Sequence, residues 1–324
     1  MATQVAEIIS DDIADIGDYR SNSLWRMTLR RLFRQRSAIV GMTILGILVL
    51  VAVFAPVIAP YDPTQVLIGV EDVKRREAPC IHMLGCPTDK PQHIMGVDGN
   101  VRDVFSRIVY GARISLRVGF ITVGFAIVVG TILGAVAGYV GGWVDNIIMR
   151  LMDVLLAFPF LLLAIALAFV LEDIIGRGLT TAMLAIAIVS IPAYARVVRA
   201  TVLSVREMDY VEASRALGAS HFQILFGRIL PNALPPLIVQ ATLGIATAII
   251  ETASLSFLGV GAQEPTPEWG YMLGSERNQL FSAPHLVFYP GIAIMITVLA
   301  FNLLGDGLRD AMDPRLVHSG VKQE

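Results

Sequence analysis

Five histidines and two cysteines are the side chains of this 324-residue sequence best suited to act as bases, nucleophiles or metal ligands. The sequence has no His-Glu-x-x-His pair, no Gly-x-Ser-x-Gly turn and no carboxylate pair accompanied by a histidine. A nucleotide-binding P-loop ends in Gly-Lys, and none of Lys74, Lys90 and Lys322 follows a glycine. We therefore expect no enzymatic bond chemistry, no cofactor and no nucleotide site in this chain.

Cys80, His82, Cys86 and His93 lie close together in the sequence and carry groups that bind metals. Their spacing does not match a standard zinc pattern. Two cysteines in an oxidising compartment usually pair, so a Cys80–Cys86 disulfide is favoured over a metal site. Two free thiols are the third alternative.

The composition predicts a membrane protein. Hydrophobic residues make up 55% of the chain and charged residues 16%, and the mean hydropathy is +0.67. A soluble domain is about 25% charged, so an ordinary cytosolic enzyme and a disordered chain are both disfavoured. The net charge of −2 does not suggest nucleic-acid binding.

Chargeless runs of the length needed to cross a bilayer recur along the chain. They predict an all-α polytopic membrane protein with six transmembrane helices. The expected spans lie near 38–60, 114–140, 149–171, 179–203, 232–257 and 287–308.

The distribution of arginine predicts that both termini are cytoplasmic. Six arginines precede the first span, and the connection between the fourth and fifth spans is also basic. The loop 61–117 holds eight basic residues, but long loops follow the positive-inside rule less well. The acidic start of the chain, with no basic residue before Arg20, argues against a secretory signal peptide.

These patterns divide the chain into consecutive regions. We expect an acidic cytoplasmic tail (1–22), a basic amphipathic segment (23–37), a first span (38–61), an extracytoplasmic loop with an amphipathic helix (62–113), a five-helix core (114–310) and a cytoplasmic tail (311–324). In the amphipathic helix, Arg102, Asp103 and Arg107 are expected on the face opposite the apolar residues. Glycines at four-residue spacing in the second span predict close helix packing. They are Gly130, Gly134, Gly138 and Gly142.

A short segment between the fourth and fifth spans, near 209–220, has the features of a docking helix. Glu212 to Leu217 is rich in small residues, and Gly218 suits a helix stop with positive φ. Pro231 suits the first turn of the next helix. Such a helix is suited to a groove of another protein, and a plain interfacial connector is the alternative.

This segment resembles the EAA loop of ABC importer permeases. The matching residues are Glu212, Ala213, Gly218, Leu230 and Pro231, whereas Ser214 replaces an alanine and Arg228 stands where the motif has isoleucine. Residues 23–315 are similar to the second permease subunit of the dipeptide, oligopeptide and nickel importers. Segments that carry this similarity include 54–63, 106–116, 255–259 and 305–315. The sequence departs from the family pattern at two places in the expected outer loop. Residues 96–103 differ from the usual Gly-Thr-Asp-x-x-Gly-Arg-Asp run, and residues 64–95 form a longer loop than is usual in the family.

The resemblance implies a type I importer permease in a bacterial or archaeal plasma (inner) membrane. Its implied partners are a second permease, two ATPase subunits that bind ATP and Mg²⁺, and an extracytoplasmic peptide-binding protein. The residues implied to couple the permease to the ATPase are Glu212, Ala213, Ala216, Leu217 and Gly218. Peptides are the expected substrate, and nickel chelates or opines are alternatives. A secondary transporter is disfavoured because we find no internal repeat.

Glu251 is an isolated carboxylate within the expected fifth span. Charged residues inside a membrane are functional by default, and Thr247, Thr252, Ser254 and Ser256 lie near it in the sequence. Glu251 is therefore a candidate for the translocation path, where it would meet a peptide amine or guard the gate. A hydrogen bond to a neighbouring helix is an equally favoured explanation.

Overall fold

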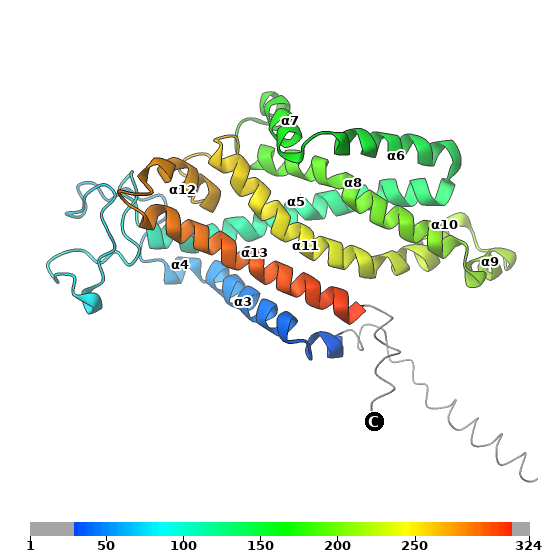
Figure 1. Cartoon of the computed structure of the whole chain (residues 1–324), viewed down its shortest axis with the longest axis horizontal. Coiled ribbons are helices and arrows are strands. Elements are labelled where there is room, and N and C mark those ends of the chain that lie inside the picture. The colour runs from blue at the N-terminus through cyan, green and yellow to red at the C-terminus, as the bar shows by residue number, and fades with distance from the viewer. Residues whose placement is uncertain (1–28, 313–324) are drawn as a thin grey trace, which may run out of the picture.

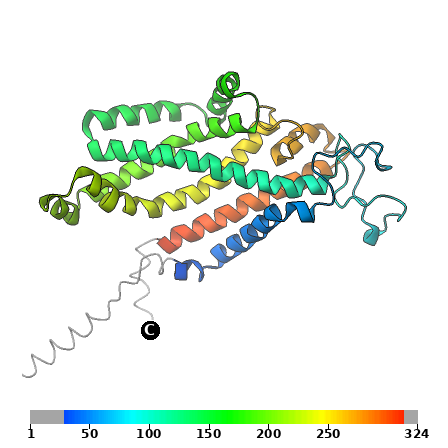
Figure 2. The same ribbon diagram turned by 180° about the vertical axis from the view of Figure 1, so that it is seen from behind.

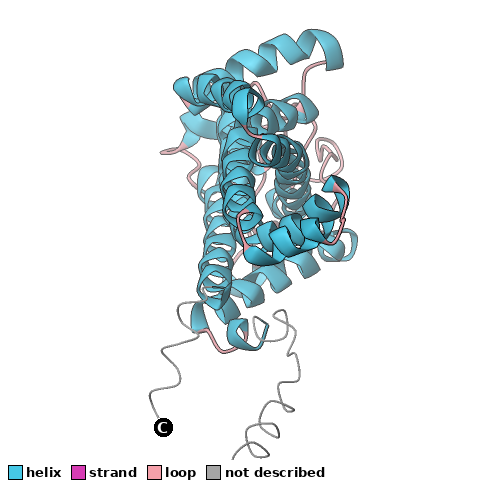
Figure 3. Ribbon diagram, turned by 90° about the vertical axis from the view of Figure 1, so that its right-hand side faces the viewer, coloured by secondary structure: helices cyan, strands magenta, loops and turns pink. Residues whose placement is uncertain are grey.

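Helices joined by loops make up the described part of the chain, residues 29–312, in this computed structural model (Figures 1 and 3). The expected acidic tail, the first six residues of the basic segment and residues 313–324 of the C-terminal tail lie outside it. Within the described residues, five helical stretches are long and apolar enough to cross a membrane. They are α3 (Arg36–Val53), α5 (Val104–Val140), α8 (Leu179–Arg206), the run His221–Phe257 that includes α11 (Leu230–Phe257), and α13 (His285–Met312).

The long helices pack side by side along one direction (Figures 1 and 2). The most extensive pairing is between α5 and α8, and α11 contacts α5, α8 and α13, while α3 lies at the edge against α13. Gly130, Gly134 and Gly138 lie on α5 and face α8, as their spacing predicts. Gly142, the fourth expected member of the stripe, is instead the first residue of α6, and a Cβ there meets nothing within 4 Å. A Cβ at Gly130 would lie 2.7 Å from Cβ of Tyr194, and one at Gly138 would lie 2.9 Å from Cβ of Val202. These two helices therefore touch nearly backbone to backbone.

The expected third span is two helices in the structure. Helix α6 (Gly142–Ala157) and α7 (Phe160–Ile175) meet at an angle of 101°. The break lies at Phe158 and Pro159, because a proline disfavours the α conformation of the residue before it, and Phe158 is extended. The pair counts as a sixth candidate span only if the bent helices are taken together. Helix α6 is held to α8 by the ion pairs Asp145–Arg199 and Asp153–Arg196.

The second span also differs from its expected start at residue 114. Helix α5 runs without interruption from Val104, so the expected separate amphipathic helix forms its first turns. Asp103 caps the helix by accepting the backbone N–H of Ser106 at 2.7 Å, and no proline follows within the helix. Arg102, Asp103 and Arg107 are buried, contrary to the expected polar outer face. The first span is shorter than expected, because the chain breaks at Phe54 before α4 (Ala55–Ile58).

The short elements gather at the two ends of the bundle. One end carries α9 (Asp209–Ala216), α10 (His221–Ile224) and a π-helix (Leu225–Ile229), together with the first turn of α3 and the last turn of α13 (Figure 1). The opposite end carries the loop from residue 59 to 103 and α12 (Trp269–Glu276). The loop contains one 3₁₀ turn (His82–Leu84), and a second (Arg277–Gln279) follows α12. The two sets of loops are therefore separated by the length of the bundle.

Candidate functional site

Residues 209–229, here named the α9–α10 segment, form a protruding turn between α8 and α11. Helix α9 ends in a Schellman motif, in which the Ala219 N–H bonds to the Ser214 carbonyl and the Gly218 N–H to the Arg215 carbonyl. Gly218 has φ of +84°, which is the left-handed conformation expected from the sequence. The tight stop turns the chain directly into α10.

A reciprocal cap starts α10. The Ser220 hydroxyl accepts the Gln223 N–H at 3.3 Å, and the Gln223 side chain accepts the Ser220 N–H at 2.9 Å. Val211, Ile224 and Ile229 are fully buried beneath the segment. These contacts hold the α9–α10 segment in one shape against the end of the bundle.

The outer surface of this segment is apolar and exposed. Leu217 is 88% exposed, Phe222 69% and Phe226 54%, and the two phenyl rings lie with their centroids 4.3 Å apart. These residues border a hollow of about 560 Å³ that also reaches Arg228. Exposed apolar patches of this kind mark protein contacts. Glu212, Ala213 and Ala216 on α9 are also exposed, but they do not line this hollow, so of the expected coupling residues only Leu217 borders it.

Glu251 lies in the half of α11 nearer to α12, beside a partly exposed stripe. Thr247 and Ile250 are exposed, and Ser254 is partly exposed. The hydroxyls of Thr247 and Ser254 donate to carbonyls one turn earlier in the same helix. Glu251 has no hydrogen-bond or ion-pair partner among the described residues. The stripe borders an apolar hollow of about 380 Å³ between α7, α11 and α13.

Comparison with known proteins settles the family. Residues 130–318 match the sequence model of "Binding-protein-dependent transport system inner membrane component", and residues 23–79 match the N-terminal TM domain of oligopeptide transport permease C. The chain belongs to this permease family. It is 45% identical over 298 residues, 92% of both chains, to the dipeptide transport system permease protein DppC of Alkalihalophilus pseudofirmus. It is also 45% identical over 292 residues, 90% of this chain and 91% of the relative, to the glutathione transport system permease protein GsiD of Escherichia coli.

Solved structures agree on the fold of the permease. A chain of the MetNI methionine ABC transporter in an inward-facing conformation aligns with a TM-score of 0.53 at 23% identity. The alignment covers 64% of this permease and 97% of that chain. Its family membership makes the permease a transport subunit of a binding-protein-dependent ABC importer, in which ATP hydrolysis belongs to partner subunits. Binding protein, ATPase and partner permease are all implied by membership of this family.

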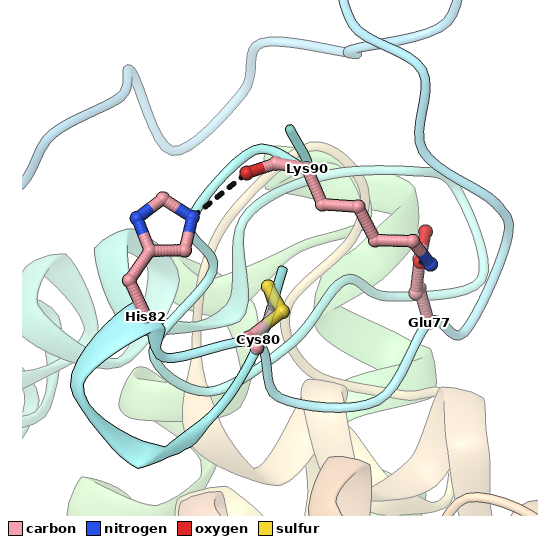
Figure 4. The surroundings of a disulfide bond; sticks show 5 residues. Glu77, Cys80, His82 and Lys90 are labelled. Atoms are coloured by element: carbon pink, nitrogen blue, oxygen red, sulfur yellow. Dashed lines mark hydrogen bonds and ion pairs between the residues drawn. A yellow bond between two sulfur atoms is a disulfide. The ribbon is translucent and has the colours of Figure 1, made fainter. Parts of the chain in front are cut away.

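The loop 59–103, which the sequence predicts to be the outer loop, contains a disulfide between Cys80 and Cys86, with Cα atoms 5.4 Å apart (Figure 4). The Cys80 N–H donates to the His93 carbonyl at 2.9 Å. Nε2 of His82 lies 2.8 Å from the Lys90 carbonyl oxygen, and Lys90 pairs with Glu77 at 3.2 Å. The two cysteines and two histidines therefore each have partners other than a shared ion. This disulfide loop lies outside both family matches, which end at residue 79 and resume at 130.

We expect the Cys80–Cys86 disulfide to be present in the purified permease. Because it closes a short loop, its contribution to stability should be at the low end of the roughly 2–4 kcal/mol typical of disulfides. In mass spectrometry of the denatured protein, iodoacetamide should label neither cysteine before reduction and both after it. Two labelled cysteines in the unreduced sample would contradict the pairing.

A buried polar network at the base of the outer loop is the feature that the sequence analysis missed. Nδ1 of His93 lies 2.9 Å from Asp103, and Nε2 lies 3.1 Å from Glu71. Carboxylates only accept, so both ring nitrogens donate and the imidazolium form is favoured. Burial opposes the charge, but the two carboxylates outweigh it and raise the pKa of His93.

A second set of ion pairs fastens the loop 59–103 to the segment between α11 and α12 and to α12 itself. Arg102 pairs with Asp98 at 2.9 Å and reaches Glu264 at 3.3 Å. Arg76 pairs with Glu276 of α12 at 2.8 Å, although 200 residues separate them in the sequence. The alternation of acidic and basic residues over 98–107 was the available signal, but in the sequence it resembled a solvated helix face.

Proposed function

We propose that this permease imports short peptides, together with a second homologous permease and two ATPase subunits that bind ATP and Mg²⁺. The α9–α10 segment carries the proposal, because an exposed apolar patch on a rigid turn between two spans suits docking of the ATPase. In this proposal Glu212, Ala213, Ala216, Leu217 and Gly218 form the contact that couples hydrolysis to transport. An extracytoplasmic binding protein delivers the substrate to the opposite end.

Two relatives of known transport class support the peptide assignment. The DppC relatives are named for dipeptides and the GsiD relatives for glutathione, which is itself a tripeptide-like molecule. DppC of Haemophilus influenzae is 46% identical over 285 residues, which cover 88% of this chain and 92% of the relative. Nickel chelates or opines are the alternative substrates.

Affinity purification tests the assembly. A tag on this permease should retain a second permease and an ATP-hydrolysing subunit from detergent-solubilised membranes. Liquid chromatography and mass spectrometry of molecules bound to the cognate binding protein should detect di- or tripeptides. Recovery of the permease alone, or of a binding protein filled with a nickel chelate, would contradict the assembly or the peptide assignment, respectively.

We propose that both termini and the α9–α10 segment are cytoplasmic, as the arginine distribution predicts. Val70 in the outer loop is 64% exposed, and Ala216 is exposed on α9. In intact cells that lack the ATPase, so that no docked subunit covers Ala216, a membrane-impermeant maleimide should label Val70→Cys at least tenfold more than Ala216→Cys. The two variants should label equally after the membrane is made permeable. Strong labelling of Ala216→Cys in intact cells would overturn this topology.

Glu251 is proposed to face the translocation path or the partner permease, because facing lipid would cost an ionised carboxylate several kcal/mol. Glu251→Gln preserves the shape and removes the charge. We expect it to lower peptide uptake at least fivefold while the complex still assembles. The matched control is Gln240→Glu, which adds a carboxylate on α11 nearer to the α9–α10 segment. Unchanged uptake by Glu251→Gln would exclude a role for the charge in the path.

A further inference from the structure

One hydrogen bond links the α9–α10 segment to the longest helix of the permease. Oη of Tyr139, near the end of α5, lies 2.7 Å from Nδ1 of His221, the first residue of α10. The two rings also meet edge to face, with centroids 5.8 Å apart. Among residues 29–312, no other side-chain hydrogen bond joins α5 to the α9–α10 segment. Tyr139 also packs against the main hydrophobic core of the bundle.

Helix α5 is well built to carry a displacement along the bundle. At 37 residues and 1.5 Å per residue it is about 55 Å long, and it contains no proline. The close contact of its glycine stripe with α8 stiffens it further. At its other end, Asp103 bonds to His93, and Arg107 donates to the backbone carbonyls of Pro63 and Pro265, which anchors the helix to the loop 59–103 and to the segment before α12. Movement of Tyr139 would therefore reach the end of the permease that faces the binding protein.

The direct chain connection to α11 is softer. It passes through the π-helix Leu225–Ile229, whose hydrogen bonding departs from that of the α-helix. Pro235 and Pro236 then remove two backbone donors from the second turn of α11. A helix start that lacks these bonds bends more easily than α5. Force applied to the α9–α10 segment is consequently better transmitted through Tyr139 than through the chain into α11.

We propose that Tyr139 is a positioning residue that transmits movement of the α9–α10 segment to α5 through its hydrogen bond to His221. This inference rests on the proposed docking of the ATPase at that segment. Loss of the hydroxyl leaves the docking surface of Leu217, Phe222 and Phe226 in place. Loss of the Tyr139 hydroxyl should therefore lower transport per ATP hydrolysed without preventing assembly of the complex.

The test uses the complete complex reconstituted in liposomes with its binding protein, and glycyl-leucine and glutathione as probes. Tyr139→Phe should keep ATP hydrolysis within twofold of wild type and lower the number of probe molecules imported per ATP at least fivefold. Tyr110→Phe is the matched control, because it removes the same hydroxyl from α5 where that group has no partner in the described structure. His221→Leu should reproduce the loss, and His221→Gln, which still hydrogen-bonds, should restore at least half of the wild-type ratio.

A second readout does not depend on the substrate. Spin labels at Ile132→Cys on α5 and Leu299→Cys on α13, both about half exposed, report the separation of the two helices. Trapping the ATPases with ATP and vanadate should change this distance in wild type and Tyr110→Phe. In Tyr139→Phe the change should fall by at least half.

A wild-type distance change together with a wild-type import ratio in Tyr139→Phe would overturn the inference. Failure of the proposed docking has a different signature, because Gly218→Leu would then assemble and transport normally. If Gly218→Leu is defective and Tyr139→Phe is normal, docking at the segment stands and transmission through Tyr139 is wrong.

Discussion

Gly218→Leu is expected to leave the permease inserted in the membrane but to lower its association with the ATPase, or its transport per ATP, at least tenfold. In the permease alone, a Cβ at Gly218 meets no atom within 4 Å. The side chain would instead project from the docking surface, beside Leu217 and Ala219. The φ of +84° adds a backbone strain of roughly 1–2 kcal/mol for any L-residue with a Cβ.

Gly259→Leu separates docking from strain. Gly259 ends α11 in a Schellman motif like that of Gly218, has φ of +82°, and a Cβ there likewise meets nothing within 4 Å, but it lies at the other end of the bundle. Its thermal stability should fall about as much as that of Gly218→Leu, while co-purification with the ATPase stays normal. Equal loss of ATPase binding in the two variants would assign the effect to backbone strain.

Gly134→Leu should be the most destabilising single substitution considered for this permease. A Cβ at this position would press on the Ala195 carbonyl and lie 3.0 Å from Cβ of Val198. Backbone atoms of a packed helix cannot turn aside, so α5 and α8 must separate. Inserting extra atoms into a well-packed core typically lowers folding stability by about 1–3 kcal/mol, and we expect Gly134→Leu to cost at least the upper end of this range.

The measurement is the yield and melting temperature of the detergent-solubilised variant by fluorescence-detected gel filtration. The matched control is Gly124→Leu, ten residues earlier in α5, where a Cβ meets nothing within 4 Å. It should retain the wild-type yield within twofold, whereas Gly134→Leu should lose at least five-sixths of it. Similar yields for both variants would show that the α5–α8 contact tolerates separation.

The length of the chargeless apolar runs predicted the all-helical membrane architecture, which the structure and the family confirm. Hydrophobicity reports where a helix is buried in lipid, but it does not report where a helix continues past the membrane. For this reason the first turns of α5, with Arg107 and Ser106, looked like a separate surface helix. The apolar run after Asp153 similarly concealed the sharp bend between α6 and α7, although Pro159 is a sequence signal for a helix break.

The positive φ of Gly218 could be predicted from the sequence, because a helix that ends in the left-handed conformation strongly prefers glycine there. The ion-pair partners of Arg76 and Arg102 could not be predicted from the sequence, because Glu276 and Glu264 are far away along the chain. Long-range pairing of buried charges depends on how the loop folds over α12, and no local pattern encodes it. The hydrogen bond of Tyr139 to His221 was hidden for the same reason.

Import by the reconstituted complex is the most direct test of the central claim. Liposomes should contain this permease, its partner permease and the two ATPases, with ATP inside and the binding protein loaded with a labelled dipeptide outside. Uptake should require both ATP and the binding protein, and it should be at least fivefold lower with Tyr139→Phe in place of wild type. Uptake that proceeds without ATP, driven by an ion gradient alone, would contradict the central claim.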